Sequence, residues 1–212
     1  MRKITAKKMN ILYKARNYLA QKPIFFSFLR EVIELNFRKQ KRLIGETIGK
    51  NSKDKKILDI GCGTGAFARL FDKENYFGID ILPDYIEYAK KNNKGSFQIM
   101  DATDLKFPNE HFDRVLIMAV LHHLNDEDSN KVIREAKRVL KPNGQILIME
   151  DAKIPRLENA LARFTQKFDK GEFIRTPKNY KKIIKPHLKI LKESEFKNGA
   201  CVYFGMFLEK KQ

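Results

Sequence analysis

The sequence predicts an α/β fold, in which helices cover a mostly parallel β-sheet. From Lys56 onward, short apolar runs alternate with segments of helical periodicity, as in parallel sheets whose strands are joined by helices. The length of 212 residues suits one domain with a sizeable core. The turn Lys197-Asn198-Gly199 between the last two apolar runs predicts a hairpin, so the sheet should end in an antiparallel pair.

Seven apolar runs are expected to form strands. The predicted strands are Lys56–Ile60, Tyr76–Ile79, Ser96–Met100, Arg114–Met118, Gln145–Glu150, Leu188–Glu193 and Ala200–Glu209. Between them, the predicted helices are Gly65–Lys73, Pro83–Asn92 and Asp128–Leu140. A turn is expected at Lys141-Pro142-Asn143-Gly144, where proline stops the preceding helix and Asn-Gly reverses the chain.

Residues 1–55 are predicted to form a basic helical extension or cap on a main domain at 56–212. Apolar residues recur at helical spacing from Met9 to Leu19. They recur again over Ile24–Ile48, after Pro23, and Gly49 is placed to end this second helix. Within the main domain, residues 152–186 are expected to form a basic, partly helical insertion on the substrate side.

The net charge of +17 is concentrated at the two ends of the chain. Residues 1–56 carry a net +12 and residues 153–212 a net +9, whereas residues 57–152 carry −4. Two interpretations stay open. The lysines form an ordinary solvated surface, or they form a basic face for an anionic partner.

Cysteine use and the absence of a targeting pattern favour a cytoplasmic protein. Cys62 and Cys201 are too few for a disulfide framework or a thiolate metal site, and no spacing of His, Cys and acids suggests a metal. Arg30 and Glu31 interrupt the apolar stretch 24–37, which argues against a signal peptide or a membrane span. Peripheral contact with an anionic membrane stays compatible with the basic N-terminus.

A glycine-rich loop follows the first predicted strand, in the segment Asp59-Ile60-Gly61-Cys62-Gly63-Thr64-Gly65-Ala66. Glycines there permit a sharp turn and let backbone N–H groups approach a ligand. Alone, the loop is ambiguous. It also fits the dinucleotide fingerprint, with Asp80 at the distance of the ribose-binding acid, so an NAD-dependent oxidoreductase is a competing hypothesis.

Four features of the chain separate the two hypotheses. They are Asp59-x-Gly61-x-Gly63-x-Gly65, then Met100–Leu105 with Phe107-Pro108, then Phe112–Met118 with Leu121-His122-His123-Leu124, and finally Arg138–Ile148. Together they resemble the class I S-adenosylmethionine-dependent methyltransferases, specifically the small-molecule and lipid group, strongly over Lys56–Asp151 and weakly over the closing hairpin. The resemblance implies a Rossmann-like, mostly parallel seven-stranded sheet of order 3-2-1-4-5-7-6 whose last strand is antiparallel.

The resemblance also implies S-adenosylmethionine as the cofactor and S-adenosylhomocysteine as a product. Asp59 would lie near the methionine ammonium, Asp80 at both ribose hydroxyls and Asp101 at the adenine amine. The glycines Gly61, Gly63 and Gly65 would give backbone room. Ile81 and Ala102 would contact the adenine, and Met118 would lie beneath the methionyl part. Acids at strand ends suit a cationic nucleoside, whereas they would repel a pyrophosphate.

His122 and His123 follow the fourth predicted strand, beside the expected methyl position. Methyl transfer by displacement can rely largely on alignment, so proton acceptance by either histidine competes with a capping or packing role. In the insertion, Arg175 and Tyr180 are candidate ligands of an anionic acceptor. A surface ion pair is the alternative role for Arg175.

The acceptor is expected to be a small, anionic metabolite. A phospholipid head group is the second hypothesis, because the N-terminal segment is basic and amphipathic. RNA is the third, since basic flanks attract phosphates although no RNA-binding module is recognisable. A non-catalytic S-adenosylmethionine-binding protein stays open as well, because a fold does not fix a function.

Overall fold

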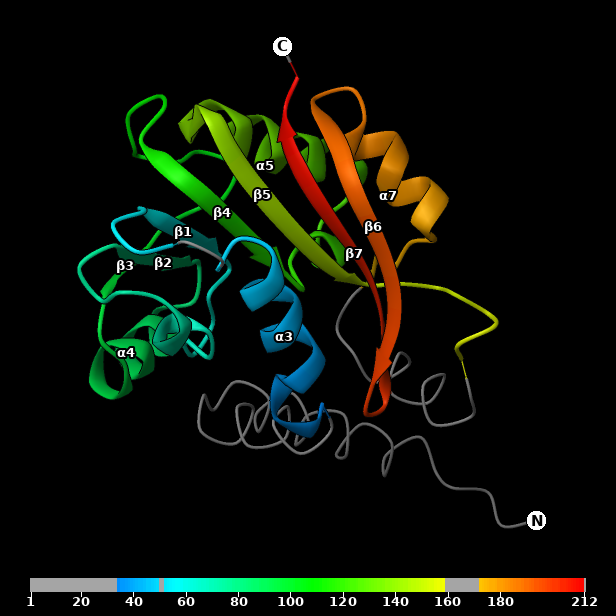
Figure 1. The fold of residues 1–212 in the computed structure, drawn as a ribbon, viewed down its shortest axis with the longest axis horizontal. Helices are drawn as coiled ribbons and strands as arrows, with labels where there is room; N and C mark the ends of the chain where they lie inside the picture. Colours follow the sequence, from blue (N-terminus) through cyan, green and yellow to red (C-terminus); the bar gives the residue numbers. More distant parts are fainter. Residues whose placement is uncertain (1–33, 50–51, 159–171, 212) are drawn as a thin grey trace, which may run out of the picture.

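The computed structural model describes residues 34–49, 52–158 and 172–211 (Figure 1). These residues form a seven-stranded sheet of order β3-β2-β1-β4-β5-β7-β6. The strands are β1 (Ile57–Ile60), β2 (Tyr76–Asp80), β3 (Ser96–Ile99), β4 (Phe112–Met118), β5 (Leu140–Asp151), β6 (Leu188–Asn198) and β7 (Cys201–Lys210). Strands β1 to β5 pair in parallel, and β7 runs antiparallel to β5 and β6. The predicted order and the antiparallel last strand are confirmed.

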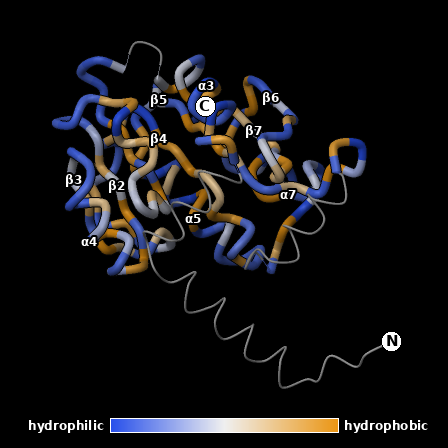
Figure 2. The backbone as a smooth tube through the Cα atoms, turned by 90° about the horizontal axis from the view of Figure 1, so that it is seen from below, coloured by the Kyte–Doolittle hydropathy of each residue, from blue (hydrophilic) through white to orange (hydrophobic). Residues whose placement is uncertain are grey.

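Helices cover both faces of the sheet. The α-helices are α3 (Arg38–Glu46), α4 (Pro83–Asn92), α5 (Asp126–Val139) and α7 (Pro177–Ile184), and the 3₁₀ turns are η1 (Leu35–Phe37), η2 (Ala68–Leu70) and η3 (Leu121–His123). One face packs against α3 and α4, and the other against α5 and α7 (Figure 1). Central strands are therefore buried on both sides, as parallel strands require, and Figure 2 shows hydrophobic residues along β4, β5 and α5.

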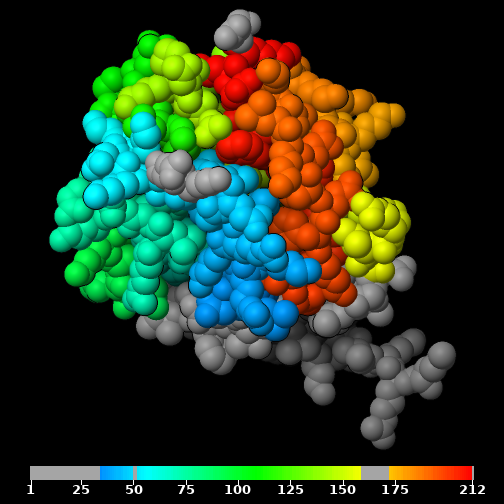
Figure 3. Space-filling view, viewed as in Figure 1, coloured from blue at the N-terminus to red at the C-terminus, as the bar shows by residue number. Residues whose placement is uncertain are grey.

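Helix α3 docks on the sheet beside the strands that carry the site. Ile44 of this helix and Ile48, which follows its C-terminal end, are fully buried in one cluster with Leu116 of β4 and Leu147 of β5. Figure 3 shows this segment, in blue, between the cyan β1 region and the orange hairpin strand β6. The division of the chain at residue 55 into two units stays a prediction.

The predicted helix Ile24–Ile48 is confirmed over α3 and is wrong at Leu35–Phe37, because the chain breaks at η1. Leu35, Asn36 and Phe37 all have left-handed backbones, with φ of 48°, 54° and 53°. This turn buries the Glu34 carboxyl group, which accepts hydrogen bonds from Gln40 Nε2 at 2.8 Å and from the Tyr203 hydroxyl. The helix Met9–Leu19 lies outside the described residues.

The predicted helix Gly65–Lys73 is also wrong, because only the short turn η2 forms there. Gly61, Gly63 and Gly65 have φ of 71°, 52° and 78°, so no right-handed helix can begin before Ala66. Phe71 is already extended, with φ −131° and ψ 161°. Few residues remain between these two limits, and they form one 3₁₀ turn.

The predicted turn at 141–144 lies inside strand β5. Phe112 pairs with Leu140 and Arg114 with Gln145, so the four residues 141–144 face the single residue Asp113 of β4. The chain accommodates Pro142 and Gly144 as an irregularity in the ladder. No helix in the described ranges is both long and apolar enough to span a membrane.

Candidate cofactor and active site

The glycine loop lies between the carboxyl ends of β1 and β4. A Cβ on Gly61 would lie 2.3 Å from Cγ2 of Val120, so only glycine lets the loop approach the chain after β4. At Gly63, by contrast, no atom lies within 4 Å of the Cβ position. Gly61 is thus required by packing, whereas Gly63 borders open space.

The Asp80 carboxylate closes the loop from the end of β2. Its Oδ2 accepts from Gly63 N at 2.9 Å, and its Oδ1 accepts from Leu82 N at 2.9 Å. Partial burial raises the pKa of this carboxyl, and the backbone N–H groups that it binds oppose the rise. Each oxygen keeps one further lone pair with which to accept a hydrogen bond.

Asp101 follows the next strand at the same sheet edge. Met100 N donates to Asp80 O at 3.0 Å, which holds the two strand ends together. Asp101 Oδ1 accepts from both the backbone N–H and the hydroxyl of Thr103, each at 2.8 Å, and these bonds lower the pKa of Asp101. The carboxylate therefore stays ionised with a fixed orientation.

Two large apolar side chains are exposed beside these carboxylates. Ile81 is 62% exposed and Ile99, which pairs with Asp80 in the sheet, is 57% exposed. Exposed isoleucines next to carboxylates form a surface for a ligand that has an apolar face and hydrogen-bond donors along its edges.

Asp59 is the most buried of the three strand-end acids. The Tyr76 hydroxyl donates to Asp59 Oδ2 at 2.5 Å. Burial raises the pKa of Asp59 to about 7, the Tyr76 hydrogen bond opposes this rise, and the charge of Asp80 adds to it. Asp59 pairs with Gly78 of β2, two residues before Asp80, so the two acids lie at neighbouring strand ends.

Beyond β4, a strained residue leads into the histidine turn. Ala119 has φ 56°, and its N–H donates to Met149 O at 2.9 Å. Met118, just before it, is almost fully buried and packs in the cluster that contains Phe37 and Phe67. The chain thus turns sharply at the carboxyl end of β4, opposite Gly61.

Glu150 organises this turn, and sequence reasoning missed it. Its buried carboxylate accepts from Val120 N at 3.1 Å, Leu121 N at 2.9 Å, His122 N at 3.3 Å and the His122 ring Nδ1 at 2.8 Å. The sequence signal was an acid at the end of the apolar run 146–149, because a buried acid needs several donors.

The two histidines have different surroundings. His122 is fully buried and bound to Glu150, whereas His123 is exposed, with its ring centroid 4.1 Å from that of His122. His122 therefore has a structural explanation, and His123 is the exposed histidine of the turn.

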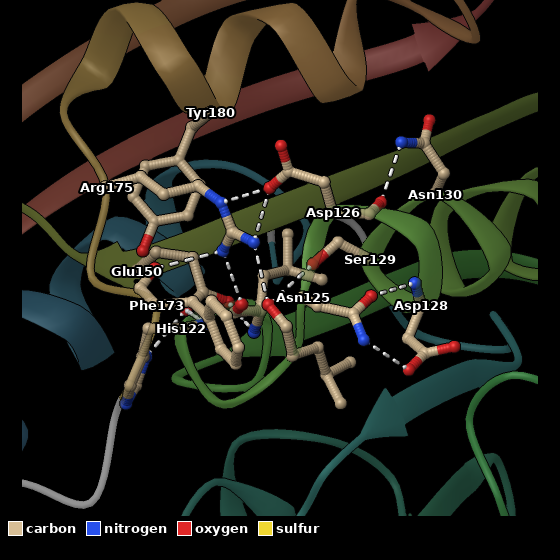
Figure 4. Close-up of polar contacts among 12 residues, drawn as sticks. His122, Asn125, Asp126, Asp128, Ser129, Asn130, Glu150, Phe173, Arg175 and Tyr180 are labelled. Carbon is tan, nitrogen blue, oxygen red and sulfur yellow. Dashed lines mark hydrogen bonds and ion pairs between the residues drawn. The ribbon is translucent and has the colours of Figure 1, made fainter.

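The guanidinium of Arg175 is buried and surrounded by hydrogen-bond acceptors of the protein (Figure 4). Its Nε and Nη2 donate to Asp126 Oδ1 at 2.9 and 2.7 Å, Nη1 donates to Leu121 O and Phe173 O at 2.7 and 3.0 Å, and Nη2 donates to Leu124 O at 2.7 Å. These bonds use all five N–H groups of the guanidinium. This geometry therefore gives no support to the prediction that Arg175 binds the anionic substrate.

Tyr180 packs against the Arg175 guanidinium. Its ring lies 5.8 Å from the Arg175 guanidinium, and its buried hydroxyl donates to Asp151 O at 2.8 Å. Burial raises the pKa of Tyr180. Arg175 and Tyr180 thus fix the segment before α7 against η3, where Phe173 N also donates to His122 O at 2.9 Å. Within the described residues, no group of three His, Cys, Asp or Glu is placed to hold a metal ion.

Comparison with protein families decides between the two cofactor hypotheses. Residues 58–148 match the family model described as a methyltransferase domain. This region is a class I S-adenosylmethionine-dependent methyltransferase domain. The match covers the glycine loop, Asp80, Asp101 and the histidine turn, and the dinucleotide hypothesis is set aside.

Named relatives of the methyltransferase domain differ in what their names say they act on. The chain is 32% identical over 94 residues to probable tRNA methyltransferase 9B of Mus musculus, covering 43% of this chain and 21% of that protein. It is 32% identical over 107 residues to phosphoethanolamine N-methyltransferase of Plasmodium falciparum, covering 47% of this chain and 40% of that protein. The chain therefore spans less than half the length of either relative.

A solved structure agrees with the fold. The crystal structure of human N-acetylserotonin methyltransferase in complex with S-adenosylmethionine superposes with a TM-score of 0.66 at 20% identity, over 90% of this chain and 56% of that one. At this level of identity the likeness shows that the methyltransferase domain has the same fold.

Proposed function

We propose that this chain transfers the methyl group of S-adenosylmethionine to a small anionic acceptor. The observation that carries the proposal is the set of acids at the carboxyl ends of β1, β2 and β3, beside the open side of Gly63. Open α/β sheets bind ligands at this edge. The cofactor supplies a sulfonium-activated methyl group, and acids favour its cationic parts.

The hydrogen-bonding capacity of each acid supports an assignment to one part of the cofactor. Asp80 accepts one backbone N–H on each oxygen, which leaves one lone pair on each oxygen for a ribose hydroxyl. Both Thr103 bonds fall on Asp101 Oδ1, so Oδ2 suits the adenine amine, with Ala102 beside the ring and Ile81 against its face. Asp59 suits the methionine ammonium, and Met118 would lie beneath that part.

His123 is the candidate to accept a proton from the acceptor. It lies in η3, directly after the carboxyl end of β4, and its side chain is exposed. Much of the acceleration can come from alignment of the nucleophile with the methyl group and from exclusion of water, so the histidine is needed only for an acceptor that loses a proton.

A basic groove supports the anionic character of the acceptor. It has a volume of about 640 Å³, and its lining includes Lys153, Arg156, Lys178 and Lys181 together with apolar Ile154, Pro155 and Pro177. Arg156 pairs with Glu195 and Lys181 with Glu193. In the described part of the chain, no carboxylate lies within 4.0 Å of the ammonium groups of Lys153 and Lys178, so the groove keeps a positive charge.

The groove begins close to the histidine turn. Phe173 N binds His122 O at 2.9 Å, and Thr176, which lines the groove, follows Phe173 by three residues. Three extended residues span at most about 10 Å. An acceptor whose anionic group lies roughly this far from its methylated atom would reach both places.

The reaction is tested by calorimetry with S-adenosylmethionine and by screening paired acidic and neutral compounds of similar size for release of S-adenosylhomocysteine. We expect tight binding, turnover of acidic compounds and inhibition by salt. Equal turnover of both classes without a salt effect would contradict the anionic acceptor. Binding without turnover of any compound would favour the non-catalytic alternative.

The double variant Lys153→Glu/Lys178→Glu tests the groove. We expect its KM for an acidic acceptor to rise at least about fivefold, because two attractive charges become repulsive. Its KM for a neutral compound should stay unchanged. The matched control is Lys90→Glu/Lys94→Glu, in which two exposed lysines of the α4 region are reversed. An equal rise of KM in both double variants would assign the effect to net charge and would contradict binding of the acceptor in the groove.

A phospholipid or an RNA acceptor is the alternative for the same chemistry. The name of the mouse relative specifies tRNA, and both ends of this chain are basic. Sedimentation with anionic vesicles and RNA retention in gels separate the two. Vesicle binding that is lost on deletion of residues 1–22 would favour lipid, and salt-sensitive RNA retention would favour RNA.

A further inference from the structure

Tyr76 is a fully buried tyrosine at the start of β2, and the reaction proposed above makes no use of it. Its ring stacks on Phe71 with a centroid distance of 5.9 Å and packs on Phe97 at 5.6 Å. Gly95 has φ 135°, and a Cβ there would lie 2.9 Å from Tyr76 Cδ1. Aromatic rings and backbone thus fix the tyrosine in one position.

The fixed ring brings its hydroxyl to a single acid. The hydroxyl donates to Asp59 Oδ2 at 2.5 Å, and both residues are buried. A buried carboxylate is unfavourable unless donors compensate for the lost water. Tyr76 supplies such a donor on the side of Asp59 that faces α4.

The other described groups that face Asp59 do not favour its ionised form. Asp80 of β2 is itself acidic, and the Cys62 thiol of the glycine loop has a pKa raised by burial and by these two acids. The residue of β4 that pairs with Asp59 is Leu116, and the α4 residues buried in this layer are Ile86 and Ala89. Among the residues that the structure describes, Tyr76 is therefore the side chain that opposes neutralisation of Asp59.

We propose that Tyr76 is a positioning residue for the cofactor, which holds Asp59 as an ionised acceptor under the glycine loop and so makes cofactor binding proton-linked. The role rests on the proposed function, because a cationic group of the cofactor is what would need Asp59 ionised. Binding of that cation would draw a proton off Asp59, and the proton would pass to the buffer.

The variant Tyr76→Phe removes the hydroxyl and keeps the ring. The pKa of Asp59 lies at about 7 in the native protein, so it should rise further when this donor is lost. We expect the Kd for S-adenosylmethionine to increase at least about fivefold at pH 7 and to approach the native value at pH 9, where Asp59 is ionised in both proteins. Proton release on binding, measured by calorimetry in buffers of different ionisation enthalpy, should move to higher pH.

Two further variants separate positioning from packing. Phe97→Leu loosens the ring packing but keeps the hydroxyl, so its Kd should change by a similar factor at every pH. Asp59→Asn should bind weakly with no pH dependence in this range. Thermal unfolding checks that each variant is folded.

The possible failures are distinguishable. Native protein that does not bind S-adenosylmethionine at any pH would overturn the proposed function. Native protein that binds the cofactor, with a Tyr76→Phe variant whose Kd changes equally at pH 7 and pH 9, would overturn the positioning role alone. A native Kd that is constant from pH 6 to pH 9, without proton release, would also overturn it.

Discussion

Asp80→Ala is expected to weaken S-adenosylmethionine binding by at least about tenfold. The variant removes the acceptors for both ribose hydroxyls. It also releases Gly63 N and Leu82 N, which hold the glycine loop against the end of β2. Both losses act at the same place, so the effect should exceed that of one neutral hydrogen bond. Calorimetry with purified protein measures it directly.

Two companion variants show whether the carboxylate itself is responsible. Asp80→Asn keeps the shape but leaves one acceptor oxygen in place of two, so its affinity should lie between those of Asp80→Ala and the native protein. Glu87→Ala removes an exposed acid of α4 that pairs only with Lys91 in the described residues, and its affinity should be unchanged. An unchanged affinity in Asp80→Ala would remove the ribose assignment.

The parts of the fold that could be predicted are those set by local periodicity. Strand β1, for example, is four buried residues followed by glycines, and this pattern fixes both its place in the core and the position of its carboxyl end. The resemblance then supplied the sheet order. The positions of Asp80 and Asp101 at one edge of the sheet follow from this order, because each acid lies at or just after the carboxyl end of a strand.

The parts that could not be predicted depend on partners far away in the sequence. Arg175 binds Asp126, 49 residues earlier, and Asn198 donates to Glu34 O at 2.5 Å across 164 residues. Such partners leave no trace in the composition of either segment. Arg175 lies in a basic insertion and was therefore predicted to bind an anion. In the structure its guanidinium instead donates hydrogen bonds to Leu121 O and Leu124 O, at the two ends of η3.

The break of the helix at η1 has the same origin. Residues 24–48 have good helical periodicity, and local propensity alone would continue the helix. The buried cluster of Glu34, Gln40, Asn198 and Tyr203 joins this segment to the closing hairpin. Satisfying those buried polar groups outweighs the left-handed strain at Leu35, Asn36 and Phe37.

Glu150→Ala is expected to lower the free energy of unfolding by about 3–5 kcal/mol. The carboxylate is fully buried and accepts three backbone N–H bonds of η3 and one from the His122 ring. Alanine would leave these donors without their acceptor, and a buried unsatisfied donor costs about 1–3 kcal/mol. Urea unfolding measures the difference.

Glu193→Ala provides the matched control, because it removes a glutamate from the exposed strand β6. Glu193 pairs with Lys181 at 2.9 Å, and surface ion pairs of this kind contribute about 0–1 kcal/mol. The two variants remove the same side chain, so the difference between them isolates the buried network. A similar loss of stability in both would mean that Glu150 does not organise the histidine turn. If it does, a folded Glu150→Ala protein should also methylate its acceptor more slowly, because η3 carries His123 beside the end of β4.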